Sequence, residues 1–159
     1  MMKQSAIVFS LIGTLLVFAC AGARPESAAT GPAGLPITPR DLGQIAGIEW
    51  HLTKMTLDNK SITLVQNSET TFACDQKGNA NGKATINRYS GNFKLLDDGE
   101  IIWNKAFIMT RMAGPPELMQ QEALFTQALM KSSRMLVNDS KLTLRSQDNS
   151  TVLVFVQAK

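Results

Sequence analysis

Residues that could carry acid–base, nucleophilic or metal chemistry are scarce in this sequence. The 159 residues include one histidine and two cysteines, too few for a multi-ligand His/Cys metal site or a histidine-rich catalytic cluster. His51 stands on the polar side of an alternating stretch, which predicts a surface position without a catalytic partner. Neither a Ser-His-Asp arrangement nor an HExxH motif is present. The sequence therefore predicts no enzymatic activity, no cofactor and no bound metal.

One cysteine and one acidic turn have structural interpretations. Cys74 alternates with Phe72 on the apolar side of a predicted strand. We expect its thiol to be buried and inert, because a reactive thiol needs an electropositive and partly exposed setting. Three carboxylates between residues 97 and 100 could bind a hard cation. They flank a glycine in a predicted hairpin turn, however, where solvated acidic residues are common.

Two polar motifs are the best candidates for a site. One is NRYSG at residues 87–91, and the other is TRMAGP at residues 110–115. Both lie at boundaries of predicted elements, where loops commonly carry recognition. The candidate recognition residues are Asn87, Arg88, Tyr89, Ser90, Thr110 and Arg111.

The same motifs also have a structural interpretation. The first motif would shape a turn or bulge through Asn87, Ser90 and Gly91. An arginine of either motif would pair with Glu122 and so hold the predicted helix in place. The sequence leaves the recognition role and the structural role open.

Composition places the chain among globular proteins. Hydrophobic residues make up 44% and charged residues 18%, which excludes an acidic or low-complexity disordered chain. The formal charge of +3 and the pI near 9.0 fall far short of the dense basic footprint of a nucleic-acid binder, so no nucleic-acid partner is expected.

Short strands dominate the predicted secondary structure. Apolar and polar residues alternate with a period of two at residues 48–53 and 141–145, and a final apolar run covers residues 152–156. Asp-Gly and Asn/Ser turns separate such runs, as in hairpins. About eight strands joined mainly by tight turns predict a curved antiparallel sheet resembling a half-barrel or barrel.

A single helix is predicted at residues 115–132. This run opens with two prolines and a glutamate, which suit a first helical turn, and it is rich in strong helix formers. Its predicted apolar face consists of Leu118, Met119, Phe125, Ala128, Leu129 and Met130. The fold class is therefore α+β, with the helix packed on the sheet or in its mouth.

The first 20 residues are typical of a bacterial lipoprotein signal peptide. An uncharged apolar run at residues 6–18 is shorter than the ~20 residues that a membrane-spanning helix needs. It ends in VFAC at residues 17–20, which resembles a lipobox, although phenylalanine is unusual at the second position. We expect Cys20 to be lipidated. The alternative is ordinary signal-peptidase cleavage after Ala23.

The remaining chain divides into a linker and a domain. Residues 21–37 are rich in proline, glycine and alanine and are predicted to form a disordered linker, and residues 38–159 form the folded domain. Because no aspartate follows Cys20, enterobacterial sorting would place the protein in the outer membrane, facing the periplasm and held by its lipid anchor. Cleavage after Ala23 would instead give a periplasmic or secreted protein.

The two motifs resemble the signatures of the META domain family, as in the heat-shock-inducible HslJ-like lipoproteins. Glu122, Phe125 and Leu129 extend the second signature, and the resemblance covers about residues 38–159. It implies one domain of antiparallel strands and a helix. It also implies an association with heat stress, drug tolerance, motility or secretion, without an established enzymatic activity.

The chain departs from the family pattern at two positions. Family members commonly carry cysteines where this chain has Ile86 and Gly114. The resemblance implies that those cysteines form a disulfide in other members. We therefore expect Ile86 and Gly114 to be neighbours that pack together in its place.

Two functions remain possible from the sequence. The first is a non-enzymatic envelope lipoprotein of the META/HslJ type, acting in envelope stress or drug tolerance by surface recognition of an unidentified envelope protein. The alternative is a small-molecule-binding module that uses a cavity between the curved sheet and the helix.

Overall fold

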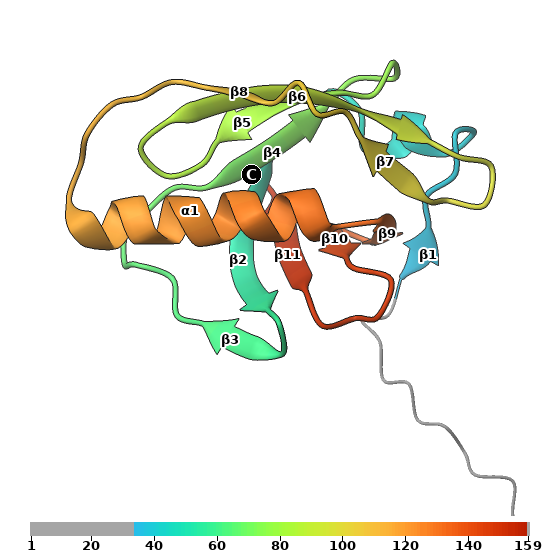
Figure 1. Cartoon of the computed structure of the whole chain (residues 1–159). Helices are drawn as coiled ribbons and strands as arrows, with labels where there is room; N and C mark the ends of the chain where they lie inside the picture. The colour runs from blue at the N-terminus through green and yellow to red at the C-terminus, as the bar shows by residue number, and fades with distance from the viewer. Residues whose placement is uncertain (1–33, 159) are drawn as a thin grey trace, which may run out of the picture.

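A curved antiparallel sheet and one long helix make up residues 34–158, which are the residues that the computed structural model describes (Figure 1). The helix α1 spans Pro116–Lys131, and a short 3-10 helix spans Leu42–Gln44. The strands are β1 (Leu35–Pro36), β2 (Trp50–Leu57), β3 (Lys60–Ile62), β4 (Thr71–Cys74), β5 (Asn79–Lys83), β6 (Arg88–Leu95), β7 (Ile101–Trp103), β8 (Ile108–Met109), β9 (Arg134–Asn138), β10 (Lys141–Arg145) and β11 (Val152–Gln157).

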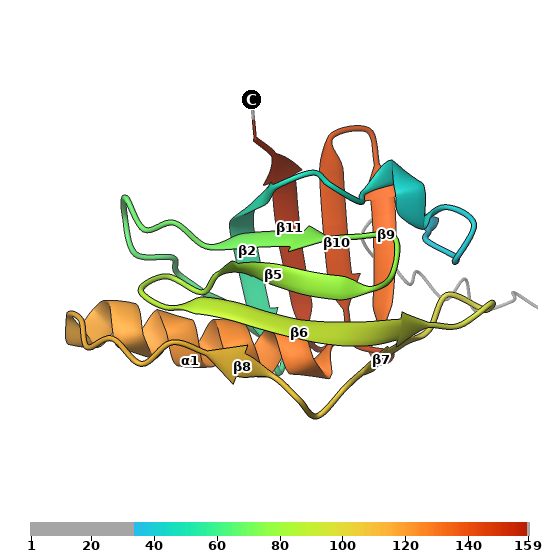
Figure 2. The same ribbon diagram turned by 90° about the horizontal axis from the view of Figure 1, so that it is seen from above.

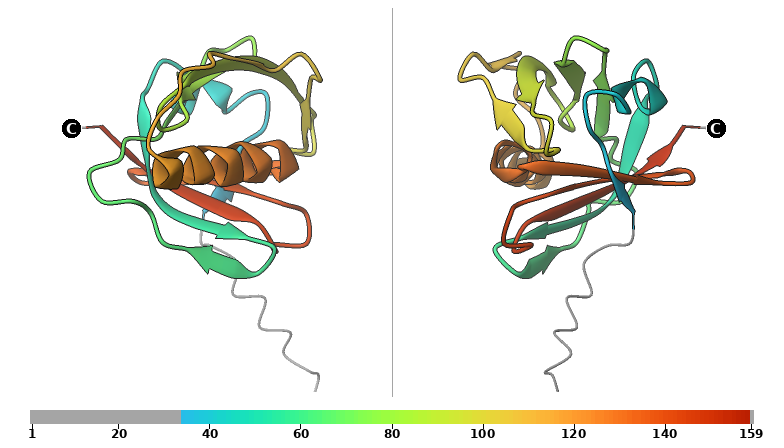
Figure 3. Two further views of the ribbon diagram at one scale, coloured as in Figure 1. Left: turned by 60° about the vertical axis from the view of Figure 1, so that its left-hand side comes forward. Right: turned by 90° about the vertical axis from the view of Figure 1, so that its right-hand side faces the viewer.

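The strands follow the order β1-β9-β10-β11-β2-β4-β5-β6-β7, with β3 beside β2 and β8 beside β6, and every pairing is antiparallel. The sheet bends round so that its two halves cross in projection, but it stays open (Figures 2 and 3). The predicted α+β class with a curved sheet and one helix is confirmed. Residues 34–158 contain eleven strands rather than eight; β1 and β8 have only two residues each, too few for an alternating pattern.

A bulge in β2 changes which residues face the core. Trp50 is buried and Leu52 partly buried, but in the pairing with β11 the register shifts between Val154 and Phe155. Beyond that point the buried positions of β2 are Met55 and Leu57. The bulge inserts one extra residue, so that odd-numbered residues of β2 face the core after it, where even-numbered residues faced the core before it.

The helix closes the open side of the curved sheet (Figure 3). It starts with Pro116 at its first position, carries Glu117 in its first turn and ends at Lys131, one residue inside each predicted boundary. These end charges complement the helix dipole. The predicted apolar face is correct at Phe125, Ala128 and Leu129, which are buried, whereas Met130 is exposed.

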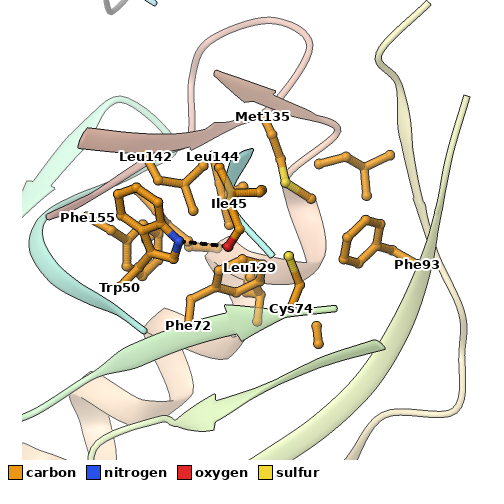
Figure 4. Packing of buried hydrophobic residues seen from close by; sticks show 14 of the residues in the cluster. Ile45, Trp50, Phe72, Cys74, Phe93, Leu129, Met135, Leu142, Leu144 and Phe155 are labelled. Carbon is orange, nitrogen blue, oxygen red and sulfur yellow. Dashed lines mark hydrogen bonds between the residues drawn. The ribbon is translucent and has the colours of Figure 1, made fainter. Parts of the chain in front are cut away.

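Aromatic and aliphatic side chains together fill the core, among them Trp50, Phe72 and Phe155 (Figure 4). Phe72, Phe125 and Phe155 are fully buried, and the Phe155 ring packs against both others, with its centroid 5.9 Å from that of Phe72 and 6.5 Å from that of Phe125. The Trp50 indole N–H donates to the Ile45 carbonyl over 3.3 Å. Burying such rings stabilises the fold by roughly 1.5–3 kcal/mol each.

The folded domain begins earlier than its sequence indicates. The predicted linker reaches residue 37, but β1 pairs with β9 and Ile37 is only 1% exposed. This boundary is therefore wrong by a few residues, because the prolines of this stretch suggest a linker and are equally compatible with an edge strand. The predicted signal peptide, Cys20, and residues 21–33 of the linker lie outside the described residues. No helix within residues 34–158 is both long and apolar enough to cross a membrane.

Candidate functional site

A buried carboxylate links the helix to the first motif. Glu122 is 5% exposed, and its Oε2 accepts the backbone N–H groups of Ile86 and Asn87 over 3.1 and 2.7 Å. Its Oε1 accepts the Asn87 side-chain amide over 2.7 Å. Two successive backbone N–H groups form an anion-binding concavity, so the negative charge is met without a cation. The predicted ion pair of Glu122 with Arg88 or Arg111 is wrong.

Asn87 in turn holds the second motif. Its Oδ1 accepts the Thr110 hydroxyl over 2.8 Å and the Met112 N–H over 2.7 Å. Its Nδ2 donates to the Met112 carbonyl over 3.1 Å in addition to Glu122. All four hydrogen-bonding positions of this amide are therefore occupied. Because Asn87 is 2% exposed, it positions the motif and cannot itself contact a partner.

Gln121, a second buried polar residue of the helix, binds the segment that precedes β4. Gln121 accepts the Val65 N–H over 2.6 Å and donates to the hydroxyls of Ser68 and Thr70. The Thr70 hydroxyl lies 3.1 Å from that of Thr85, whose φ of +124° is unfavourable for a β-branched residue. Helical periodicity could have found Gln121, because it lies four and seven residues before Phe125 and Ala128 and therefore on the buried face of the helix.

The rest of the first motif forms a strand, which corrects the expected turn or bulge. Tyr89 is buried, and its hydroxyl donates to the Thr71 carbonyl over 2.9 Å. Burial raises the pKa of this phenol well above its usual range. Phe107 stacks on Tyr89 with ring centroids 5.4 Å apart. A Cβ on Gly91 would lie 3.0 Å from Phe107 Cδ2, so the glycine leaves room for that ring. A recognition role for Tyr89 is therefore wrong.

Four of the six candidate recognition residues remain at the surface. Arg88 and Ser90 are exposed on β6, with the buried Tyr89 between them. Thr110 and Arg111 are exposed beyond the end of β8. Neither arginine forms an ion pair within residues 34–158. The two motifs therefore meet, but only part of each is available to a partner.

An open pocket of about 490 Å³ lies between the second motif and the helix. Its apolar lining comes from Phe107, Met109, Met112 and Met119. Arg111 contributes its positive charge, and Glu122, which already accepts three N–H groups, lies at one side. Methionine side chains adapt their shape to different apolar partners. The methionines of the pocket, together with the arginine, suit an apolar group that carries a negative charge.

The expected contact between Ile86 and Gly114 is confirmed. A Cβ placed on Gly114 would lie 2.8 Å from Ile86 Cδ1 and Cγ1, closer than real Cβ contacts allow. The isoleucine side chain therefore occupies the space that a side chain at position 114 would need. This packing joins the turn before β6 to the segment that enters α1.

The other chemistry-bearing residues stay outside this site. The ring of His51 is one-third exposed and lies 3.4 Å from the Glu49 carboxylate. Asp98 accepts the Glu100 N–H in its turn, and Arg134 donates to the Asp98 carbonyl. Within residues 34–158 no group of three or more His, Cys, Asp or Glu side chains could hold a metal ion.

We expect Cys74 to be unreactive in the folded protein. The residue is 3% exposed, and burial raises the pKa of its thiol to about 12. In a Cys20→Ser variant at pH 8, iodoacetamide should leave Cys74 unmodified until urea unfolds the chain. Modification of the native protein at the rate of a free cysteine would show that the thiol is accessible.

The fold and the site define a small α+β module in which a buried Asn–Glu pair holds an exposed motif beside a helix. The META domain model matches residues 43–159, more than half of the chain, and the chain therefore belongs to the META domain family. No curated protein matches the chain.

Solved structures share this fold. A protein from Burkholderia xenovorans, solved by NMR, has a TM-score of 0.63 and 23% identity, over 86% of this chain and 97% of that one. A DUF4847 family protein from Bacteroides vulgatus ATCC 8482, solved by crystallography, has a TM-score of 0.50 and 11% identity, over 72% of this chain and 95% of that one. At these identities the likeness concerns the fold alone.

Proposed function

We propose that this META domain protein is a non-enzymatic, lipid-anchored protein of the bacterial envelope. It recognises another envelope component through the pocket beside the second motif and acts in envelope stress or drug tolerance. The observation that carries the proposal is the pocket itself, because Arg111 and Met112 are exposed there while both backbone groups of Met112 are held by Asn87.

The motifs combine buried residues that hold the backbone with exposed residues that can contact a partner, and this combination supports recognition at the pocket. All four hydrogen-bonding positions of the Asn87 amide are occupied, and Glu122 already accepts three N–H groups, so this buried pair fixes the backbone of the motifs. A rigidly held surface loses less conformational entropy on binding than a mobile one does. The exposed arginine and methionines then supply charge and adaptable apolar contact, two features typical of protein interfaces.

The two exposed arginines allow a matched test. In a strain lacking this protein, survival of heat stress would be measured after complementation with Arg111→Ala or Arg88→Ala. We expect Arg111→Ala to fail and Arg88→Ala to succeed, since only Arg111 lines the pocket. Both purified variants should melt within about 2 °C of the parent, as exposed substitutions usually do.

Two results would count against this proposal. Equal complementation by both variants would show that the pocket arginine is dispensable. A fall of several degrees in the melting temperature of Arg111→Ala would mean that the residue holds the fold.

The anchor is tested at Cys20. Two or more acyl chains hold a protein stably on a membrane, whereas one chain holds it only marginally. We expect Cys20→Ser to release a soluble protein or to leave an unprocessed precursor, as seen by fractionation and gel mobility. A Cys20→Ser protein that still matures and sediments with membranes would contradict lipidation.

A small apolar ligand is the second candidate for the same pocket. Buried side chains fill the core between sheet and helix, and this pocket offers a ligand an apolar lining at the margin, beside Phe107 and Met119. Fluorescence of 1-anilinonaphthalene-8-sulfonate, titrated against the parent and Met119→Glu, would distinguish the two candidates. Saturable binding that Met119→Glu abolishes favours the ligand, and its absence favours the protein partner.

A further inference from the structure

The strand β8 leaves one of its edges free. It pairs with β6 with Tyr89 opposite Met109, and just beyond it the Thr110 N–H donates to the Arg88 carbonyl over 3.0 Å. Backbone groups of an extended chain point alternately to its two sides. The N–H and C=O groups of Met109 therefore point away from β6, at the margin of the sheet (Figure 2).

The free edge continues beyond β8. Both backbone groups of Met112 are bound by the Asn87 side chain, on the same side as the Thr110 N–H. The backbone groups of Arg111 between them therefore point to the other side, as those of Met109 do. Within the described part of the chain, no hydrogen bond satisfies the backbone of Met109 or Arg111 on that side. Such a row of free groups is a template for an additional strand.

The pocket flanks this edge. It lies between residues 107–113 and the helix, where Met119 forms the far wall. A strand added about 4.8 Å from β8 would direct alternate side chains toward the helix and toward solvent. The inward side chains would then meet the methionines of the pocket.

Charge restricts the partner further. Arg111 is the one pocket residue with a charge that is not met by hydrogen bonds within residues 34–158, because the Glu122 carboxylate already accepts three N–H groups. A carboxylate on the incoming segment would form a charge-assisted pair with this guanidinium. A second copy of the chain would instead bring two Arg111 side chains into one short ladder, which like charges disfavour.

We propose that an extended peptide segment of a partner protein adds as a strand to the free edge at Met109 and Arg111. It places an apolar side chain in the methionine pocket and a carboxylate opposite Arg111. This inference rests on the proposed function and names the chemistry of its partner.

Random dodecapeptides displayed on phage and selected on the full-length chain provide the probe. The recovered peptides should carry a large apolar residue near an aspartate or glutamate. Synthetic copies should bind Arg111→Ala about tenfold more weakly than the parent, and Arg88→Ala within about twofold, since only the first loses the charge-assisted pair. Hydrogen exchange on binding should slow at the amides of Met109 and Arg111, while the amide of Thr110, already bonded, should change little.

Three results would overturn strand addition. The first is hydrogen exchange at Met109 and Arg111 that the recovered peptides leave unchanged. The second is a selection that yields no specific peptide, and the third is dimerisation of the chain in sedimentation experiments. If strand addition fails while complementation still depends on Arg111, the recognition surface stands and only its mode of binding is refuted. If complementation does not depend on Arg111, the proposed function fails independently of the peptide result.

Discussion

Replacing Glu122 by alanine should lower the free energy of unfolding by about 2–4 kcal/mol, because three N–H donors lose their acceptor and each unsatisfied buried donor costs about 1–3 kcal/mol. The loss stays below the summed cost of three unsatisfied donors, because water in the adjoining pocket can accept some of these N–H groups. The loss should appear in urea unfolding monitored by circular dichroism. Glu122→Gln should fall between Glu122→Ala and the parent, because it keeps one acceptor oxygen but turns an NH₂ group toward donors.

The same helix offers a control for this experiment. Gln127 is exposed, and Gln127→Ala should change the unfolding free energy by less than about 0.5 kcal/mol. Asn87→Ala should resemble Glu122→Ala, and the double variant should cost less than the two single losses together, since the two residues share one network. Similar values for Glu122→Ala and Gln127→Ala would show that the buried pair does not hold the fold.

A disulfide should form between cysteines introduced at positions 86 and 114. In a Cys20→Ser background, Gly114→Cys alone should destabilise the protein by about 1–3 kcal/mol, because its Cβ would overlap Ile86. Ile86→Cys removes the overlapping atoms. The oxidised double variant should therefore be about 2–4 kcal/mol more stable than its reduced form, as loop closure predicts.

Unfolding with and without dithiothreitol, together with gel mobility, measures this difference. The buried Cys74 provides no competing thiol while the protein is folded. If the two cysteines stay reduced under mild oxidation, or if oxidation leaves stability unchanged, the contact at these positions does not have disulfide geometry.

The main elements of the fold were predictable from local patterns. Helix α1 could be placed to within one residue at each end, because proline and glutamate mark its start and the helix formers end at Lys131. The strand β1 could not be predicted, because two residues that include a proline show no strand pattern and form a strand only by pairing with β9. The switch in which residues of β2 face the core depends on a bulge in its pairing with β11. The sequence of β2 alone does not reveal such a bulge.

The site was predictable in position but not in its internal contacts. The sequence pointed to both motifs and to Glu122. It suggested an arginine as the partner of Glu122, because opposite charges pair most simply. The structure uses Asn87 and two backbone N–H groups instead, an arrangement that depends on the turn geometry before β6. Gly91 likewise indicated a turn, although its function is to make room for Phe107.

The most direct test of recognition at the pocket is photo-cross-linking in living bacteria. A benzoylphenylalanine would replace either Met112, which is 54% exposed at the pocket, or Ile102, which is 50% exposed on β7 and does not line it. Their similar exposure makes the second position a matched control for random collision. We predict a discrete cross-linked species from position 112 that Arg111→Ala abolishes, and none from position 102. Equal cross-linking at both positions, or none at position 112, would contradict recognition at this pocket.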